Sequence, residues 1–291
     1  MDFLSGQELL DLCKEKNLPI SAIMKQREIS NSSLSEEKID SKLETVLSIM
    51  KSSATRPLTH PTKSIGGLIG GEAQKVMEHS KAPSSVCGSM LSRAIAHSMA
   101  VLEVNASMGL IVAAPTAGSA GVIPGVLLAL EEEHCLSDAD LCNGLLNTAA
   151  IGYLFMRNAS VAGAEAGCQA EVGAASAMAA SAIVELMGGS PDMCLQAASL
   201  ALSNLLGLVC DPIAGLVESP CQSRNAIGVA NAITSAELAL SGICHPIPFD
   251  EMTDAMYRVG KSLPFEFRET ALGGNAGTPT GCKLGCKICS N

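Results

Sequence analysis

Three cysteines lie in surroundings suited to holding a metal centre. Cys168 lies in the glycine- and alanine-rich stretch 158–173, Cys210 directly precedes Asp211-Pro212, and Cys221 follows Pro220. Glycine and proline interrupt helices, and the backbone amides freed there can hydrogen-bond thiolate sulfur and tune a cluster. The intervals between these cysteines match no standard zinc or ferredoxin pattern. On spacing alone, scattered core cysteines fit at least as well as a metal site.

The number of cysteines bears on the compartment and on the chemistry. The chain has 12 cysteines in 291 residues. Its first residues show no basic start followed by an apolar run, so we expect no signal peptide and a cytoplasmic location. A reducing compartment disfavours a disulfide framework and favours metal binding or catalysis. Six isolated cysteines fit small buried hydrophobes: Cys13, Cys87, Cys135, Cys142, Cys194 and Cys244.

A further cysteine group, Cys282, Cys286 and Cys289, lies near the end of the sequence. Its C-x-x-x-C-x-x-C spacing matches the cluster motif of radical S-adenosylmethionine enzymes. No barrel pattern follows it, so we interpret that match as accidental. Residues 282–291 then have two interpretations of equal weight. They are a cysteine-rich tail that folds back onto an open metal position or forms a labile zinc or disulfide site, or they are a disordered end.

Polar side chains near the first three cysteines are candidates for binding substrate. Thr116 and Ser119 offer hydroxyls and turn amides to a carboxylate, or form an ordinary helix-start turn. Arg224 suits a carboxylate partner or a surface salt bridge. Asn158 and Gln169 are candidates for hydrogen-bond donors around the centre. Helix capping or a buried structural hydrogen bond is an equal alternative for each.

Two carboxylates are candidates for a general base. Glu165 and Glu171 lie in an otherwise apolar stretch, where burial raises a carboxyl pKa. A paired structural carboxylate is the commoner state of such residues. Other familiar motifs are absent from the sequence: the P-loop, the dinucleotide fingerprint, the nucleophile elbow and the zinc helix.

Composition excludes several classes of partner. The net charge is −10 and aromatic residues make up 2% of the chain, with no tryptophan. Such a chain lacks the basic footprint and the stacking platforms that nucleic acid requires. The segment between Glu103 and Glu131 is uncharged, but Pro115, Pro124 and several glycines break it. We therefore expect a buried soluble segment and no membrane partner.

The elements that must position these residues are predicted to be helices. Hydrophobic spacing predicts a helix near residues 39–50, and cap signals predict helices at 137–156 and 190–206. Asp250 is expected to cap a following helix, and residues 109–115 are the one convincing strand candidate. The fold class is therefore all-α, with little or no β structure.

Composition also divides the chain into three parts. Residues 1–65 form a helical unit that ends in a linker over 52–65, and residues 66–281 form the catalytic body. Residues 282–291 form the cysteine-rich tail.

Three long segments together resemble a known family, the α chain of bacterial iron–sulfur L-serine dehydratase (L-serine ammonia-lyase) of the two-chain type. The resemblance covers most of the chain and is specific, because the segments occur in family order and spacing. They are EVNASMGLIVAAPTAGSAGVIPG (103–125), NASVAGAEAGCQAEVGAASAMAA (158–180) and LGLVCDPIAGLVESPCQSRNAIG (206–228).

This resemblance implies a cofactor and a reaction. Three cysteines of a helical domain, matching Cys168, Cys210 and Cys221, hold a 4Fe-4S cluster whose fourth iron faces substrate. That open iron acts as a Lewis acid on the hydroxyl of L-serine, which becomes pyruvate and ammonia. Cys282 lies near the place of a tail cysteine that occupies this iron in single-chain relatives.

The resemblance also implies a partner. The acid/base Ser-His-Thr segment of the family belongs to a separate β chain, so the catalytic base is unknown here and we expect the chain to be inactive alone. Three alternatives stay open: an L-cysteine desulfidase on the same scaffold, a non-catalytic redox or electron-transfer iron–sulfur protein, and a zinc-binding structural chain.

Overall fold

The computed structural model describes residues 1–290, and their regular structure is helical. The bounds are α1 (Gly6–Lys16), α2 (Ile20–Ser32), α3 (Glu36–Thr59), α4 (Glu72–His79), α5 (Gly88–Ala106), α6 (Val122–His134), α7 (Asp138–Asn158), α8 (Gly163–Ala166), α9 (Ala174–Leu186), α10 (Pro191–Asn204), α11 (Cys221–Leu240), α12 (Phe249–Ser262) and α13 (Pro279–Cys289). Within these residues there is no strand, and an isolated parallel bridge joins Cys210 to Arg268. The predicted all-α class is confirmed.

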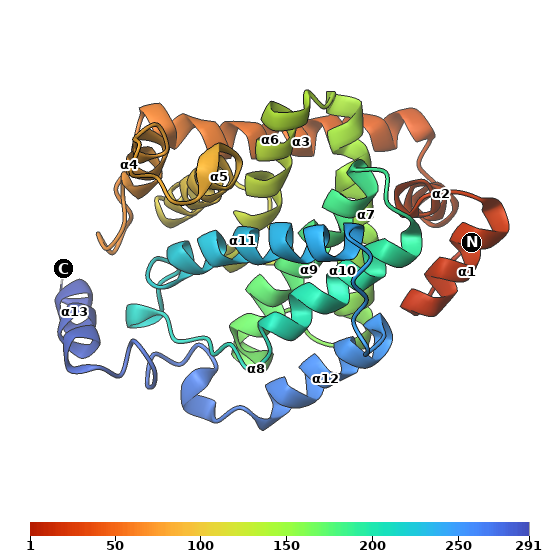
Figure 1. The fold of residues 1–291 in the computed structure, drawn as a ribbon. Helices are drawn as coiled ribbons and strands as arrows, with labels where there is room; N and C mark the ends of the chain where they lie inside the picture. Colours follow the sequence, from red (N-terminus) through yellow and green to blue (C-terminus); the bar gives the residue numbers. More distant parts are fainter. Residues whose placement is uncertain (291) are drawn as a thin grey trace.

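Helix α9 lies at the centre of the molecule, where α6, α7, α10 and α11 pack against it (Figure 1). Every residue from Ala174 to Val184 is buried. Alanine is the best helix former and adds little bulk. The alanine-rich sequence therefore produces a helix that neighbours can approach closely on all sides.

The crossing of α5 and α6 requires glycine. A Cβ atom on Gly125 would lie 2.7 Å from the carbonyl oxygen of Ala94, and one on Gly121 would overlap the Ser98 carbonyl. Backbone therefore meets backbone at this crossing. The crossing fixes the start of α6 and, with it, the segment just before α6 that carries Thr116 and Ser119.

Two helix starts follow the predicted caps. Ser137 and Asp140 form a capping box at α7, with the Ser137 amide donating to the Asp140 carboxylate at 2.8 Å. The Ser190 hydroxyl accepts from the Met193 amide at the start of α10. Local side-chain chemistry therefore determines where these two helices begin.

Three local predictions are wrong. Residues 109–115 are not a strand, because no second strand is present in residues 1–290 to pair with them. The linker predicted over 52–65 is helical as far as Thr59, because α3 continues through Pro57. Asp250 does not cap its own helix; its carboxylate accepts from the amides of Gly6 and Gln7 at 2.6 and 3.0 Å, so it caps α1.

The N-terminal helices share a core with the rest of the chain. Phe3, Leu9 and Ile23 are fully buried in the same apolar cluster as the central helices, and α2 packs on α7. The division at residue 65 stays a prediction, and the division at 281 falls inside α13.

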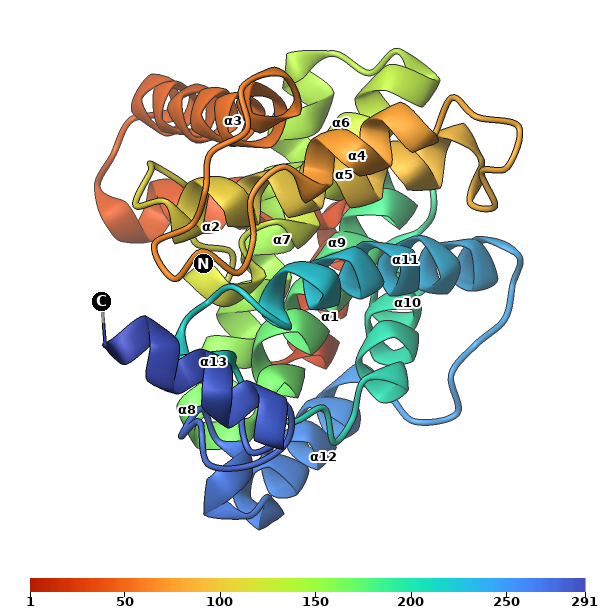
Figure 2. The same cartoon turned by 90° about the vertical axis from the view of Figure 1, so that its left-hand side faces the viewer.

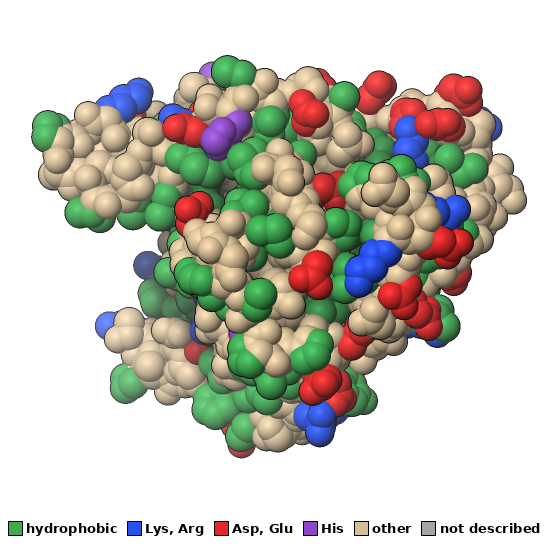
Figure 3. All heavy atoms as spheres, turned by 45° about the vertical axis from the view of Figure 1, so that its right-hand side comes forward, with side chains coloured by type: hydrophobic (Ala, Val, Ile, Leu, Met, Phe, Trp, Pro, Cys, Tyr) green, Lys and Arg blue, Asp and Glu red, His purple; other side chains and the backbone are tan. Residues whose placement is uncertain are grey.

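The surface carries mixed charge. On the face in Figure 3, the lysines and arginines lie in small separate groups among acidic and apolar side chains. In the described residues, no helix has the length and apolar character needed to cross a bilayer.

Candidate functional site

The structure brings Cys168 and Cys210 together and places Cys221 beside them. Cys168 and Cys210 pack with Val172 in a small cluster of their own, and all three cysteines are buried. The adjacent Cys168 thiol and burial together raise the pKa of Cys210 far above its usual range. Burial, followed by the nearby Cys168 and Glu171, raises the pKa of Cys221.

These thiols fit a metal centre chemically. The raised pKa values of Cys210 and Cys221 mean that their thiolate forms need a cation to offset the charge, which iron would supply. Within residues 1–290, no three cysteine, histidine or carboxylate side chains are arranged to hold a single metal ion. In an iron–sulfur cluster each cysteine binds a separate iron, so the three thiols need not converge on one point.

Irregular backbone turns the cysteines toward one another. Cys168 comes directly before a π-helical turn, Gln169–Gly173, of the kind often found at functional sites. Cys210 is held by its backbone bridge to Arg268, and Cys221 is the first residue of α11.

Gln169 holds the backbone next to Cys168 in place. It is fully buried, and its amide donates to the carbonyl oxygens of Ala166 and Met256 at 2.9 and 3.0 Å. Its own side-chain oxygen accepts from the Gly207 amide at 2.9 Å. Its side-chain hydrogen-bonding groups are thus engaged with backbone, which ties the Cys168 turn to the segment leading to Cys210.

Arg224 is partly buried and pairs with a buried carboxylate. Its guanidinium lies 2.7 Å from the Asp211 carboxylate and also donates to the Val209 carbonyl at 2.8 Å. Asp211 also accepts from the Asn275 backbone and side chain at 2.6 and 2.9 Å. This network ties the residues around Cys210 to α11.

Glu171 is the carboxylate nearest the cysteines. Its Oε1 accepts from the Thr116 hydroxyl at 2.6 Å, and its Oε2 lies 3.7 Å from the Cys210 sulfur. Burial raises the pKa of Glu171. Glu165, the other candidate base, is exposed and accepts from Ser160 at 2.7 Å. Glu171 is therefore the carboxylate that belongs to the site.

The hydroxyl segment before α6 is anchored on both sides. Thr116 and Ser119 form a capping box around the turn Ala117–Ser119, and their hydroxyl oxygens lie 3.3 Å apart. Asn225, one turn after Cys221, donates to the carbonyls of Gly118 and Cys221 at 2.8 and 2.9 Å. These contacts hold the segment against the cysteine centre.

One contact of the site was not foreseen from the sequence. Glu218, three residues before Cys221, accepts from the Ser64 hydroxyl and from the amides of Gly66 and Leu68, at 2.7, 2.6 and 2.9 Å. The carboxylate is buried, and it fixes the loop 64–68 to the segment that carries Cys221. A glutamate in a loop gives no sequence signal that its partner lies in a distant turn.

Two candidates lie away from this arrangement. Asn158 is exposed and donates to the Leu4 carbonyl at 2.9 Å. Cys282 lies in α13, is exposed, and has its sulfur 3.5 Å from the Ala276 carbonyl. Helix α13 packs on the short turn Ile213–Gly215, which lies between Cys210 and Cys221. The tail is therefore helical up to Cys289 and lies against the loop that carries two of the cysteines.

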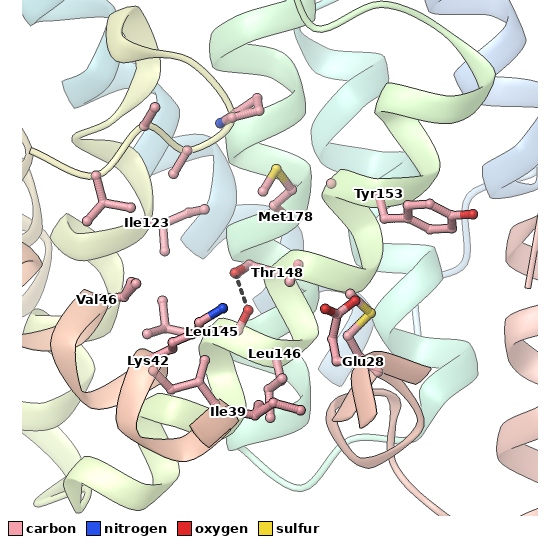
Figure 4. A pocket seen from close by; sticks show the side chains of 18 of the residues that line it. Glu28, Ile39, Lys42, Val46, Ile123, Leu145, Leu146, Thr148, Tyr153 and Met178 are labelled. Atoms are coloured by element: carbon pink, nitrogen blue, oxygen red, sulfur yellow. Dashed lines mark hydrogen bonds between the residues drawn. The ribbon is translucent and has the colours of Figure 1, made fainter. Parts of the chain in front are cut away.

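A pocket of about 500 Å³ is lined by none of the three cysteines (Figure 4). It is enclosed by α2, α3, α7 and residues 112–115. Its lining is mostly apolar, including Ile39, Leu146 and Met178. Residues 113–115 line it and lead directly into Thr116, so its wall is continuous with the site.

Comparison with known proteins places the chain in a family. A family model described as "Serine dehydratase alpha chain" matches residues 15–276. The chain belongs to the serine dehydratase alpha chain family. This confirms the resemblance that the three long motifs indicated, and the enzyme family that it implied.

Relatives in this family cover almost the whole chain. It is 46% identical over 280 residues to a protein of Peptoniphilus asaccharolyticus named L-serine dehydratase, alpha chain, covering 96% of each. It is 44% identical over 286 residues to a Bacillus subtilis (strain 168) protein named probable L-serine dehydratase, alpha chain, covering 98% of this chain and 95% of that one.

Another relative in this comparison is longer. A Streptomyces coelicolor protein named L-serine dehydratase is 37% identical over 277 residues, and the match covers 94% of this chain but 60% of that protein. The serine dehydratase alpha chain thus corresponds to part of the longer protein.

Proposed function

We propose that this chain is the α chain of an iron–sulfur L-serine dehydratase, which converts L-serine to pyruvate and ammonia in the cytoplasm. The observation that carries the proposal is the meeting of three buried cysteines from two distant segments beside Glu171 and Thr116. The family to which the chain belongs supports the same substrate.

Cys168, Cys210 and Cys221 would hold a 4Fe-4S cluster. When bound, the cluster supplies a Lewis-acidic iron that makes the serine hydroxyl a better leaving group. The chain's part is to supply three thiolates and to exclude bulk water from them, since all three side chains are buried.

Thr116 and Ser119 are our candidates for contact with the substrate carboxylate. Their turn is fixed by Asn225 and by Glu171, so its hydroxyls and amides are held in place before substrate arrives. Arg224 is already paired with Asp211, which favours a role in holding the Cys210 segment.

Gln169 supports Cys168 in the same way, through its contacts with backbone. Asn158, at the exposed end of α7, is the weakest of the substrate candidates because its side chain is bonded to the first residues of the chain.

Glu171 would hold a proton at the edge of the site. Burial raises its pKa, and the Thr116 hydroxyl fixes the orientation of its carboxyl group. Such a group can return or accept a proton as the substrate loses its hydroxyl. The base that removes the Cα proton of serine is assigned to a β chain.

A separate β chain is supported by comparison with longer relatives. This chain matches 60% of the Streptomyces coelicolor protein and 62% of an Escherichia coli (strain K12) L-serine dehydratase. We propose that a separate β chain supplies the remainder, and that the active enzyme is a heterodimer or a larger assembly built from both chains.

The decisive experiment uses the complex of both chains purified without oxygen. After enrichment with iron-57, we expect Mössbauer spectra in which one iron of the cluster shifts on addition of L-serine. A cluster whose irons all ignore serine would contradict the dehydratase proposal. Faster turnover of L-cysteine than of L-serine would favour the desulfidase, and a reversible redox couple without turnover would favour an electron-transfer role.

A further inference from the structure

Three large apolar side chains are exposed on two neighbouring loops. Ile65, Met108 and Leu110 are 68%, 79% and 71% exposed. They belong to the loop between α3 and α4 and the loop after α5, which run beside each other in Figure 2. The Ile65 amide donates to the Ala106 carbonyl at 2.9 Å, which joins the two loops. We call these three side chains the apolar patch.

Two pockets adjoin the apolar patch. One of about 380 Å³ is lined by Leu110, Gly109 and Arg56, and one of about 280 Å³ lies within residues 61–72 and includes Lys63. Arg56 and Lys63 are exposed and form no ion pair within residues 1–290. Exposed apolar side chains next to pockets are typical of sites where a partner inserts its own side chains.

Both loops of the apolar patch are attached to the candidate active site. Ser64 and Gly66, on either side of Ile65, hydrogen-bond to Glu218, which lies three residues before Cys221. Leu110 begins the segment that continues to Thr116. A protein bound to the apolar patch would therefore lie next to the cysteine centre.

We propose that the apolar patch and its two pockets are the docking surface for the β chain. This inference rests on the proposed two-chain function, in which a separate β chain corresponds to the part of the longer relatives that this chain does not match. The matching surface of the β chain would place apolar side chains in the two pockets and carboxylates opposite Arg56 and Lys63. Docking here sets the partner's catalytic groups beside the substrate site.

The test measures binding of the intact α chain to the β chain encoded by the same organism. We expect the double variant Met108→Asp, Leu110→Asp to weaken the complex about tenfold or more, since each change buries a charge in an apolar contact. The matched control is Val86→Asp, because Val86 is 94% exposed on the loop between α4 and α5. Figure 2 shows that loop well apart from residues 60–71.

A second measurement does not depend on the stability of the variant. The photo-crosslinker p-benzoylphenylalanine placed at position 110 should join the two chains in the assembled complex, and the same group at position 86 should not. A crosslink at 86 but not at 110 would overturn the proposal, as would unchanged affinity of the double variant. Failure of the unmodified chains to associate would overturn both this inference and the two-chain function.

Discussion

Each cysteine of the centre is held by a different kind of neighbour. The side chain of Gln169 holds the turn after Cys168, and a backbone bridge holds Cys210. The Asn225 side chain donates to the Cys221 carbonyl and restricts the backbone at that residue. The thiols are therefore positioned by the chain before any metal binds. Preorganisation of this kind limits the number of conformations that must be lost on cofactor assembly.

Replacing one of these thiols tests the cluster directly. We expect Cys210→Ser to lose most of its iron and to lower dehydratase activity roughly a hundredfold or more, because a hydroxyl is a poor ligand for cluster iron. Iron and sulfide per chain, measured after anaerobic purification with the β chain, check this. The exposed Cys87, changed to Ser, is the control and should keep its iron. A Cys210→Ser complex with full iron content would exclude Cys210 as a ligand.

The Thr116 hydroxyl is expected to matter through Glu171. Thr116→Val removes the donor that lies 2.6 Å from the buried carboxyl group. Loss of such a bond costs about 1–3 kcal/mol, so kcat/KM should fall roughly tenfold to a hundredfold. Thr116→Ser keeps the hydroxyl and should retain most of the activity. Equal activity in the valine and serine variants would show that this contact is dispensable.

At the scale of elements, Asp250 joins the start of α1 to the start of α12. Asp250→Ala leaves the Gly6 and Gln7 amides without their partner. Loss of a helix cap costs about 1 kcal/mol, so the urea midpoint should fall measurably. Asp254→Ala, on the same helix and exposed, is the matched control. A midpoint that moves equally in both variants would contradict the capping role.

Glu103 links α5 to α4 and α11. Its carboxylate accepts from the Ala73 amide at 2.9 Å and from the Gln222 side chain at 3.2 Å, and burial raises its pKa. The folded chain thus holds this proton more tightly than the unfolded chain does. The stability contributed by Glu103 is present below the ordinary glutamate pKa of about 4.3 and is lost as pH rises through its folded value.

The Glu103→Gln variant should therefore lose less stability than the unmodified chain between about pH 5 and about pH 8. Urea unfolding at the two pH values gives this difference. Glu78→Gln, an exposed change, should leave the pH dependence as it is. Parallel stability profiles for Glu103→Gln and the unmodified chain would show that Glu103 keeps the same pKa when the chain folds.

Local and distant interactions differ in how far the sequence reveals them. Ser137 and Ser190 begin helices through contacts with residues three positions away, so a cap motif predicts both starts. Residues 109–115 have strand-like composition, but whether they form a strand depends on a pairing partner elsewhere in the fold. Composition therefore predicted the all-α class and missed this segment.

The site shows the same distinction. Glycine and proline near Cys168, Cys210 and Cys221 are visible in the sequence and made these cysteines candidates, and the resemblance to the family implied that they are the ligands. The contact of Glu218 with Ser64 spans 154 positions, and no local pattern announces it. Because such tertiary contacts leave no local pattern, the sequence predicted the cysteines as candidates but not Glu218, which positions the segment of Cys221.

At the scale of the whole molecule, a bound cluster would tie together two distant segments, the one around Cys168 and the loop that carries Cys210 and Cys221. A ligand that binds the folded chain and not the unfolded one raises the free energy of unfolding. Removing iron with a chelator should therefore lower the midpoint of thermal unfolding and abolish activity. Calorimetry before and after chelation checks this, and the Cys210→Ser variant should show no further change. An identical midpoint with and without iron would contradict a cluster held by all three cysteines.

The cap that Asp250 places on α1 has a consequence for the order in which the protein matures. The capping residue lies 244 positions after Gly6, so it leaves the ribosome long after the helix that it completes. At about 5–20 residues per second, this interval is on the order of ten to fifty seconds. Helix α1 is thus synthesised well before the residue that completes its cap, and during that interval it stays open to chaperones and proteases.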